Sequence, residues 1–233
     1  MSAPIRGFRT RAAAALLAPA LLATAGCSGS GADDRSPEDA LAQAKQELDD
    51  TPGVEIALTT EELPEGVDGV LEATGTGTHA PAFEGSLKVR LNSITVDVPV
   101  VAVGGEVYAE LPFTSKFTEV DPADYSAPDP ALLMDPSSGL SSWLTAADDL
   151  EKGEQVRDGD TVLTGYDGVL PGETVAQVIP SADDAAEFPV VFLVDDDGLL
   201  RSIEVSGPFY GDAVVDYTVS LDEYGTEKDI TRP

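Results

Sequence analysis

Cysteine, histidine and aromatic residues are scarce in this chain of 233 residues, and each shortage excludes a class of chemistry. Cys27 is the only cysteine, so no disulfide can form within the chain, and an exported domain would have to be stable through its core alone. His79 is the only histidine, which excludes histidine-rich metal sites and leaves any Ser-His catalytic arrangement dependent on this one residue. Aromatic residues make up 6% of the chain, which is few for a carbohydrate-binding cleft.

Sequence motifs typical of enzymes are also absent. The chain has no G-x-S-x-G nucleophile elbow, no H-E-x-x-H helix, no P-loop and no dinucleotide-binding fingerprint. Gly75-Thr76-Gly77 is not followed by a predicted helix, so it indicates a flexible strand. Carboxylates are plentiful, so their number alone does not exclude a glycosidase that uses a pair of acidic residues. We therefore predict that the protein is not an enzyme and has no catalytic residues, metal site or cofactor.

Basic residues are also scarce. The chain has 13 lysines and arginines and 43 acidic residues, which gives a formal net charge of −30. A surface this acidic repels nucleic acid and anionic lipid headgroups, so we expect no nucleic-acid partner. The acidity indicates a solvated surface of the kind found in salt-adapted proteins. Attachment to a membrane would then have to come from buried acyl chains, which contribute about 0.8 kcal/mol per methylene group.

The start of the chain follows the pattern of an export signal. Arg6, Arg9 and Arg11 precede an apolar run from Ala12 to Ala25, which ends shortly before Cys27. The run is shorter than the about 20 apolar residues of a membrane-spanning helix. It is typical of the apolar region of a secretory signal peptide.

Small residues before Cys27 predict cleavage by a lipoprotein signal peptidase, although Thr24 stands where a larger apolar residue is usual. We expect residues 1–26 to be a lipoprotein signal peptide, residues 27–36 a lipidated flexible tether and residues 37–233 a single domain. Cys27 would carry acyl chains such as palmitate and hold the protein on the extracytoplasmic face of the cell membrane, within the cell envelope. A free or buried thiol at Cys27 is the alternative.

The remaining sequence alternates between apolar and polar residues with the period of strands. Ser36 as N-cap and Pro37 at the first helical position begin a helix that runs to about Asp49. Strands are expected near 54–60, 68–78, 84–92, 94–103, 106–111, 154–158, 161–169, 188–195, 199–206 and 213–221. Tight turns are expected at Asn92-Ser93, Gly104-Gly105, Asp158-Gly159 and Asp195-Asp196-Asp197-Gly198. The last of these is acidic, but a calcium loop would need more oxygen ligands spaced further along the chain.

Short helices interrupt the strands. Asp121-Pro122, Asp129-Pro130 and Asp135-Pro136 each join an N-cap residue to a proline at the first helical position, which predicts three short helices between 121 and 148. A further short helix is expected at 172–178. The sum is an α+β fold whose large antiparallel sheet curls, with the helices on its concave face.

Several strands, such as Val98–Val103 and Val190–Val194, are apolar on both faces. An ordinary filled core explains this pattern. A cavity lined by valine and leucine, between the curled sheet and the helical insert, is the alternative explanation. Composition does not separate these two alternatives.

Several segments of the chain together resemble a known family. They are the lipobox before Cys27, the strand Ser86–Leu91, the segment Val100–Leu111 with its Gly104-Gly105 turn, Asp121–Tyr125, Asp129–Pro136, Gly139–Leu144, Ile179-Pro180 and the tail Gly225–Pro233. In this order they resemble the mycobacterial lipoproteins of the LppX/LprA/LprF/LprG family, most closely its LprG branch. The composition, rich in Ala, Gly, Val and Asp, fits an actinobacterial source.

The resemblance implies a half-barrel sheet like that of the LolA/LolB carriers, wrapped around helices and enclosing an apolar cavity for acylated lipids. The lipids that it implies are triacylated glycolipids, such as phosphatidylinositol mannosides and lipoarabinomannan precursors, or triacylglycerol-type lipids. It also implies a major-facilitator-type membrane exporter as a partner. By position in the matching strand, Leu87, Val89 and Leu91 should face the pocket.

Alternation in the next strand and the apolar residues of the helical insert extend this candidate lipid-binding pocket. The additions are Val96, Val98, Leu133, Met134, Leu140, Trp143 and Leu144, and for every candidate core packing is an equal alternative to lipid contact. The predicted function is a membrane-anchored lipoprotein that binds acylated (glyco)lipids in a hydrophobic cavity and carries them across the cell envelope. The alternative is a non-catalytic scaffold or accessory lipoprotein for a membrane exporter or envelope enzyme, with a filled core and no lipid cargo.

Overall fold

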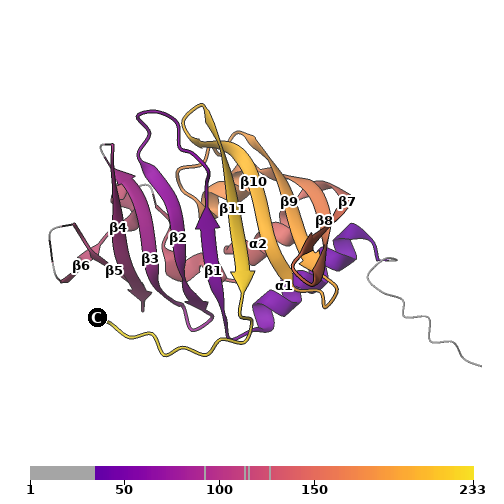
Figure 1. Ribbon diagram of the computed structural model, residues 1–233, viewed down its shortest axis with the longest axis horizontal. Coiled ribbons are helices and arrows are strands. Elements are labelled where there is room, and N and C mark those ends of the chain that lie inside the picture. The colour runs from indigo at the N-terminus through magenta and orange to yellow at the C-terminus, as the bar shows by residue number, and fades with distance from the viewer. Residues whose placement is uncertain (1–34, 92, 113, 115, 126) are drawn as a thin grey trace, which may run out of the picture. The chain divides into compact units, whose positions relative to one another are not determined.

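Eleven strands form one antiparallel sheet in the computed structural model, which describes residues 35–233 apart from 92, 113, 115 and 126. The strands are β1 (Gly53–Thr59), β2 (Gly69–Thr78), β3 (Ala82–Leu91), β4 (Ile94–Val103), β5 (Glu106–Glu110), β6 (Phe117–Val120), β7 (Asp148–Asp158), β8 (Thr161–Pro171), β9 (Glu187–Asp195), β10 (Leu200–Tyr210) and β11 (Ala213–Asp222). Their order across the sheet is β6-β5-β4-β3-β2-β1-β11-β10-β9-β8-β7, so β1 and β11 are neighbours at its centre. The sheet curls, and the helices lie on its concave face (Figure 1).

The helical segments among the described residues are α1 (Pro37–Asp50), η2 (Pro122–Tyr125), η3 (Pro130–Met134), α2 (Leu140–Ala146) and α3 (Gly172–Val178). α1 begins where the sequence predicts, because the Ser36 hydroxyl accepts a hydrogen bond from the Asp39 N–H at 3.2 Å. Its apolar stripe is buried, and the helix contacts α2, β7 and β10. η3 instead contacts β2, β3 and β4. The two ends of the concave face therefore have different helical covers.

Large side chains fill the space under one half of the sheet. Phe188, Phe192, Phe209 and Trp143 are fully buried in the cluster that joins β8–β11 to α1, α2 and α3. The buried cluster at β3–β5 contains one large aromatic residue, Phe83, and otherwise small ones: Val98, Val100, Ala102, Val107, Ala109 and Ala131. This difference in side-chain volume decides where the molecule has free space.

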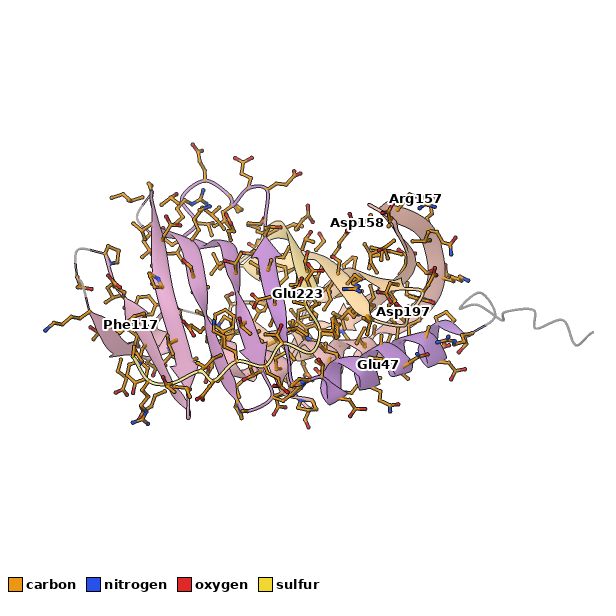
Figure 2. The ribbon with its side chains drawn as sticks, turned by 60° about the horizontal axis from the view of Figure 1, so that its bottom comes forward. Glu47, Phe117, Arg157, Asp158, Asp197 and Glu223 are labelled. Carbon is orange, nitrogen blue, oxygen red and sulfur yellow. The ribbon has the colours of Figure 1, made fainter. Side chains whose placement is uncertain are left out.

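The C-terminal tail after β11 crosses the outer, convex face of the sheet. Ile230 is 7% exposed and packs in a small cluster with Ala82 and Val101. Lys228 forms an ion pair with Glu84 at 3.2 Å, and Arg232 forms another with Glu106 at 2.6 Å. Figure 2 shows the tail leading from Glu223 toward the side of the sheet where Phe117 lies. The tail thus braces β3, β4 and β5 from outside and leaves their concave face free.

The fold class predicted from the sequence is confirmed: the domain is an α+β fold with a curled antiparallel sheet and helices on its concave face. α1, α3 and most strands lie where N-caps and alternation place them. The acidic run after β9 is the predicted turn, because the Asp195 carboxylate accepts hydrogen bonds from the N–H groups of Asp197 at 3.0 Å and Leu199 at 2.9 Å.

Two local predictions are wrong, and one strand was missed. β6 was not predicted, because a strand of four residues is too short to show alternation. The helix expected to begin at Pro136 begins at Leu140, because the Asp135 carboxylate caps a turn by accepting hydrogen bonds from the N–H groups of Ser137 and Ser138. These hydrogen bonds also lower the pKa of Asp135. β7 begins earlier than predicted, because pairing with β8 overrides the weak strand propensity of its acidic residues.

Residues 1–34 lie outside the described residues, and with them the predicted signal peptide, Cys27 and most of the predicted tether. Those boundaries stay predictions. In the part of the chain that the structure describes, no helix combines the length and the apolar composition that crossing a membrane requires.

Candidate ligand-binding cavity

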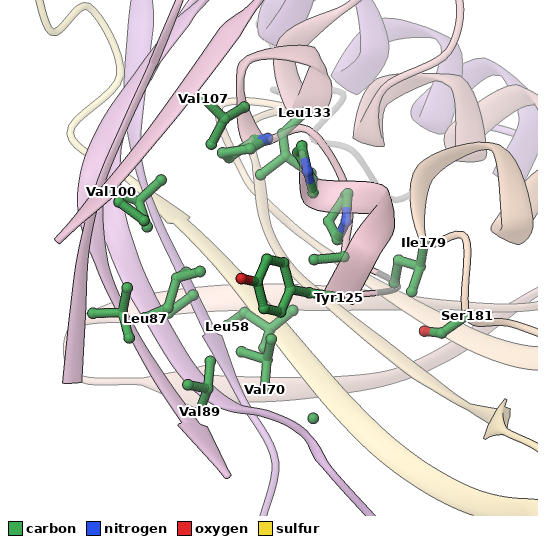
Figure 3. A pocket seen from close by; sticks show the side chains of 18 of the residues that line it. Leu58, Val70, Leu87, Val89, Val100, Val107, Tyr125, Leu133, Ile179 and Ser181 are labelled. Atoms are coloured by element: carbon green, nitrogen blue, oxygen red, sulfur yellow. The ribbon is translucent and has the colours of Figure 1, made fainter. Parts of the chain in front are cut away.

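A cavity of about 700 Å³ lies between the concave face of β1–β6 and the segment that carries η2 and η3. Its volume falls within the range of about 300–1,000 Å³ that is typical of small-molecule sites. Figure 3 shows Leu87, Val89 and Val100 from the sheet across from Tyr125 and Leu133 of the helical segment. Further walls come from β10, β11 and the end of α3. The alternative of a filled core is therefore wrong for this half of the domain.

The sheet wall of the cavity follows from strand alternation. Leu87 pairs with Val98 and Val89 pairs with Val96 in the antiparallel register of β3 and β4. Odd-numbered residues of β3 and even-numbered residues of β4 therefore point to the concave face. Because Leu87, Val89 and Val98 hold these positions, this part of the wall is an aliphatic surface that suits hydrocarbon.

The helical cover explains why this space stays open. η2 and η3 are short turns of 3₁₀ helix, and Pro122, Pro128 and Pro130 line the cavity on their side. Proline has a compact ring that cannot reach across to the sheet. The other half of the sheet is instead covered by α1, α2 and α3 and is filled by large aromatic side chains. The cavity therefore lies under the half of the sheet whose cover consists of short 3₁₀ turns and prolines.

Exposed residues mark the mouth of the cavity. Asp68, Asp124, Tyr125 and Gly211 line the cavity and are exposed to solvent. Phe83, at the end of β3 away from Asp68, is 2% exposed. Polar groups are thus found at the mouth, and the interior is apolar. This division suits an amphipathic ligand whose polar head stays at the mouth and whose apolar part lies inside.

Two tyrosines complete the cavity wall where β1 ends. The pairing of β1 with β2 stops at Thr59 and Glu72, and beyond it tyrosine hydroxyls contact the backbone of Val70. The Tyr217 hydroxyl donates to the Val70 carbonyl at 2.8 Å, and the Val70 N–H donates to the Tyr210 hydroxyl oxygen at 3.4 Å. Because the one hydrogen of the Tyr217 hydroxyl goes to Val70, the Tyr210 hydroxyl donates to Tyr217 across their 2.9 Å separation. The three hydrogen bonds form a closed ring that joins β2 to β10 and β11.

Tyr217→Phe is expected to make the loss of stability at alkaline pH less steep. Burial first, and then Tyr210, raise the pKa of the Tyr217 phenol above its ordinary value of 10.0. The unfolded chain releases this proton near pH 10 and the folded protein keeps it, so the stabilising contribution is complete below that pH. Above it, the free energy of unfolding falls by about 1.4 kcal/mol per pH unit from this one group.

Urea unfolding between about pH 8 and pH 11 measures the effect. At the lower pH, where the phenol is protonated in both states, Tyr217→Phe should lose about 1 kcal/mol because the ring of hydrogen bonds is broken. Toward the higher pH the two proteins should converge. Parallel curves for both would contradict the assignment of a buried, protonated Tyr217.

The structure brings six of the predicted pocket residues to the cavity wall: Leu87, Val89, Leu91, Val98, Leu133 and Leu140. The other four do not line it: Val96, Met134, Trp143 and Leu144. Met134, Trp143 and Leu144 are instead buried in the core cluster shared with α1 and α3. Val96 is half-buried beside the β3–β5 cluster, near the end of its hairpin. Cys27, the predicted lipidation site, lies outside the described residues.

Sequence reasoning missed the lining residues of β1, β5 and β11. Leu58, Val107 and Tyr217 belong to this group. Their strands were predicted, and alternation within each strand gives the correct inward face. The sequence does not say which strands are adjacent, because β11 lies next to β1 only once the sheet has formed.

The remaining candidate for chemistry, His79, lies away from the cavity. It occupies the turn after β2, and its Nε2 atom is 2.9 Å from the Leu48 carbonyl oxygen at the end of α1. Within the described ranges, no three His, Cys, Asp or Glu side chains are grouped so that they could hold a metal ion. The apolar cavity is thus the candidate ligand site within the described residues.

Known proteins share the sequence pattern and the fold of this chain. The profile of the LppX_LprAFG lipoprotein family matches residues 36–231. The crystal structure of LprF from Mycobacterium bovis is similar at 14% identity and a TM-score of 0.69, covering 84% of this chain and 96% of that one. LppX from Mycobacterium tuberculosis is similar at 14% identity and a TM-score of 0.63, covering 85% and 100%. At such identities the structural likeness shows the fold alone.

A LolA-superfamily protein from Nitrosomonas europaea is 7% identical with a TM-score of 0.28, covering 84% of this chain and 96% of that one. No curated protein sequence matches the chain.

Proposed function

We propose, from the premise that this chain belongs to the LppX_LprAFG lipoprotein family, that it binds acylated lipids in its cavity and carries them across the cell envelope. The observation that supports this proposal is the aliphatic cavity of about 700 Å³ with a polar mouth. Such a cavity suits a lipid, because acyl chains fit the interior while the headgroup stays in contact with water.

The binding free energy comes from removing acyl chains from water, at about 0.8 kcal/mol per buried methylene group. The predicted pocket residues that line the cavity would contact these chains: Leu87, Val89, Leu91, Val98, Leu133 and Leu140. Triacylated glycolipids and triacylglycerol-type lipids are the ligand classes that we propose, as the sequence resemblance implies. The lining offers aliphatic contact and no catalytic arrangement, so we propose a carrier and not an enzyme.

Acyl chains on Cys27 would hold the carrier at the extracytoplasmic face of the cell membrane. The net charge of −30 supports this view, because so acidic a protein gains no attraction from anionic headgroups and needs an apolar anchor. A major-facilitator-type exporter, implied by the same resemblance, would deliver lipid to that face. The carrier would then shield the acyl chains from water during transfer.

Native mass spectrometry of the delipidated protein tests the proposal. The protein is mixed with a triacylated phosphatidylinositol mannoside and, separately, with a triacylglycerol in mild detergent. A stoichiometric adduct with at least one of them is expected, because the acyl chains leave the detergent for an aliphatic cavity. Failure of both lipids to bind, with the protein folded by circular dichroism, would show that the cavity does not hold acylated lipid.

A further inference from the structure

An apolar strip on the concave face of the β3–β4 hairpin runs from the cavity out to solvent. Its members are the cross-strand pairs Leu87–Val98, Val89–Val96 and Leu91–Ile94. Val98, at the cavity end, is 7% exposed, and Ile94, at the hairpin tip, is 64% exposed. The members between them are half-buried. The aliphatic wall of the cavity therefore continues beyond the helical cover.

The tip of this hairpin carries no charge. Residues 91–96 read Leu-Asn-Ser-Ile-Thr-Val, in a chain of which 24% is charged. Ser93 adopts a positive φ of 67°, which makes the turn between β3 and β4 tight. Across the mouth, Tyr125 lines the cavity and is 54% exposed. A single exposed aliphatic side chain is ordinary, but a continuous strip that leads into a cavity marks an interaction surface.

We propose that Leu91, Ile94 and Val96 at the tip of the hairpin, here called the lip, insert into the surface of a neutral lipid bilayer, so that acyl chains pass from the bilayer along the strip into the cavity. This inference rests on the proposed lipid-binding function and adds the surface from which the cavity is loaded. Figure 3 shows Val70 and Val89 together at one end of the cavity and Val107 at the other. The Val89 end leads to Leu91 and the lip.

A bilayer fits the lip for reasons of continuity and charge. An acyl chain that enters along the strip starts in the hydrocarbon of a bilayer. Unless the lip touches that hydrocarbon, the chain is exposed to water on its way, which is unfavourable. A charged side chain at that depth would be costly, and the lip has none. The net charge of −30 elsewhere repels anionic headgroups, so contact depends on apolar side chains and favours a neutral bilayer.

A dye on the lip tests this placement in the full chain. Ile94→Cys and, as matched control, Val156→Cys are labelled with a polarity-sensitive dye and added to phosphatidylcholine vesicles. Val156 is also an exposed aliphatic residue, 43% exposed, but it lies near the β7–β8 turn, toward the other end of the sheet. Cys27 is present in both variants, so any dye on it contributes equally to both.

The dye at position 94 should brighten and be quenched by nitroxides in the upper acyl region, because interfacial segments lie about 5–10 Å into that boundary. The dye at position 156 should stay in water. Adding phosphatidylglycerol should weaken the response at 94. If vesicles of pure lipid leave the fluorescence of the dye at position 94 unchanged, the proposal is overturned. A lip that binds a protein partner instead of lipid would give this result. An equal response at both positions overturns it as well.

A second measurement separates the lip from the cavity. Ile94→Asp should slow the extraction of lipid from vesicles by at least about tenfold, because burying an isoleucine is worth more than one decade in a binding constant. The same variant should bind lipid from detergent as the unchanged protein does. If the unchanged protein binds no lipid from detergent, the proposed function fails, and the dye result still decides whether the lip docks. Extraction at an unchanged rate by Ile94→Asp overturns the lip alone.

Discussion

Leu87→Trp is expected to abolish lipid uptake while leaving the fold intact. Leu87 lies at the cavity end of the strip, pairs with Val98 and points into the cavity, where it is half-buried. An indole at this position has free volume to occupy, so it avoids the clash that overpacking causes in a filled core. The ring would fill the space that an acyl chain needs. In native mass spectrometry the lipid adduct should disappear, with the thermal unfolding midpoint changed by no more than a few degrees.

The matched control places the same ring on the other face of the hairpin. Thr95 is exposed and pairs with Arg90, on the side of β4 that faces away from the cavity. Thr95→Trp should therefore bind lipid as the unchanged protein does. If Leu87→Trp retained full binding, acyl chains would have to lie elsewhere. If both variants lost binding, the effect would come from the hairpin as a whole and would contradict a specific role for the cavity.

The fold could be predicted to the extent that local physics determines it. α1 follows from Ser36, Pro37 and one apolar stripe, and the long strands follow from alternation. Predictions failed where a contact distant in sequence decides the local structure. β6 forms because β5 offers it an edge, and the acidic start of β7 is extended because β8 pairs with it. Such pairings are properties of the assembled sheet.

The cavity wall was predictable in part. Leu87 and Val98 face inward by alternation, and both line the cavity. Trp143 has the same apolar character, but α2 places it in the filled half, where it is fully buried. Whether an inward residue meets a neighbour or free space depends on the size of the side chain opposite. That partner is set by the tertiary arrangement and cannot be read from one segment.

The hydrogen-bonded ring of tyrosines shows the same limit for polar contacts. Tyr217 donates to the carbonyl of Val70, which is distant in the chain and belongs to a strand that β1 separates from β11. Sequence alternation correctly turns Tyr217 inward. It gives no sign that the pairing of β1 with β2 ends at Thr59 and leaves room for the hydroxyl to reach β2.

Phe209→Ala is expected to cost about 3–5 kcal/mol of unfolding free energy, the range for removing a fully buried phenylalanine ring. Phe209 is fully buried between the filled and the open halves of the domain. Its ring centroid lies 5.1 Å from that of Phe188 on one side and 5.1 Å from that of Tyr217 on the other, and the second contact is edge-to-face. Because Phe209 also lines the cavity, its removal should extend the cavity toward the core and let it accept a bulkier lipid.

Phe192→Ala is the matched control for this change. Phe192 is equally buried in the filled half but does not line the cavity. Both variants should lose similar stability in urea unfolding, because each loses a buried ring. Added lipid should stabilise both, since both keep the cavity, but a lipid bulkier than the unchanged protein accepts should stabilise only Phe209→Ala, because bound ligand stabilises the folded state. Native mass spectrometry should also show a wider choice of acyl-chain length for Phe209→Ala alone. A loss below about 1 kcal/mol, or the same lipid selection in both variants, would contradict the role of Phe209 as the wall between core and cavity.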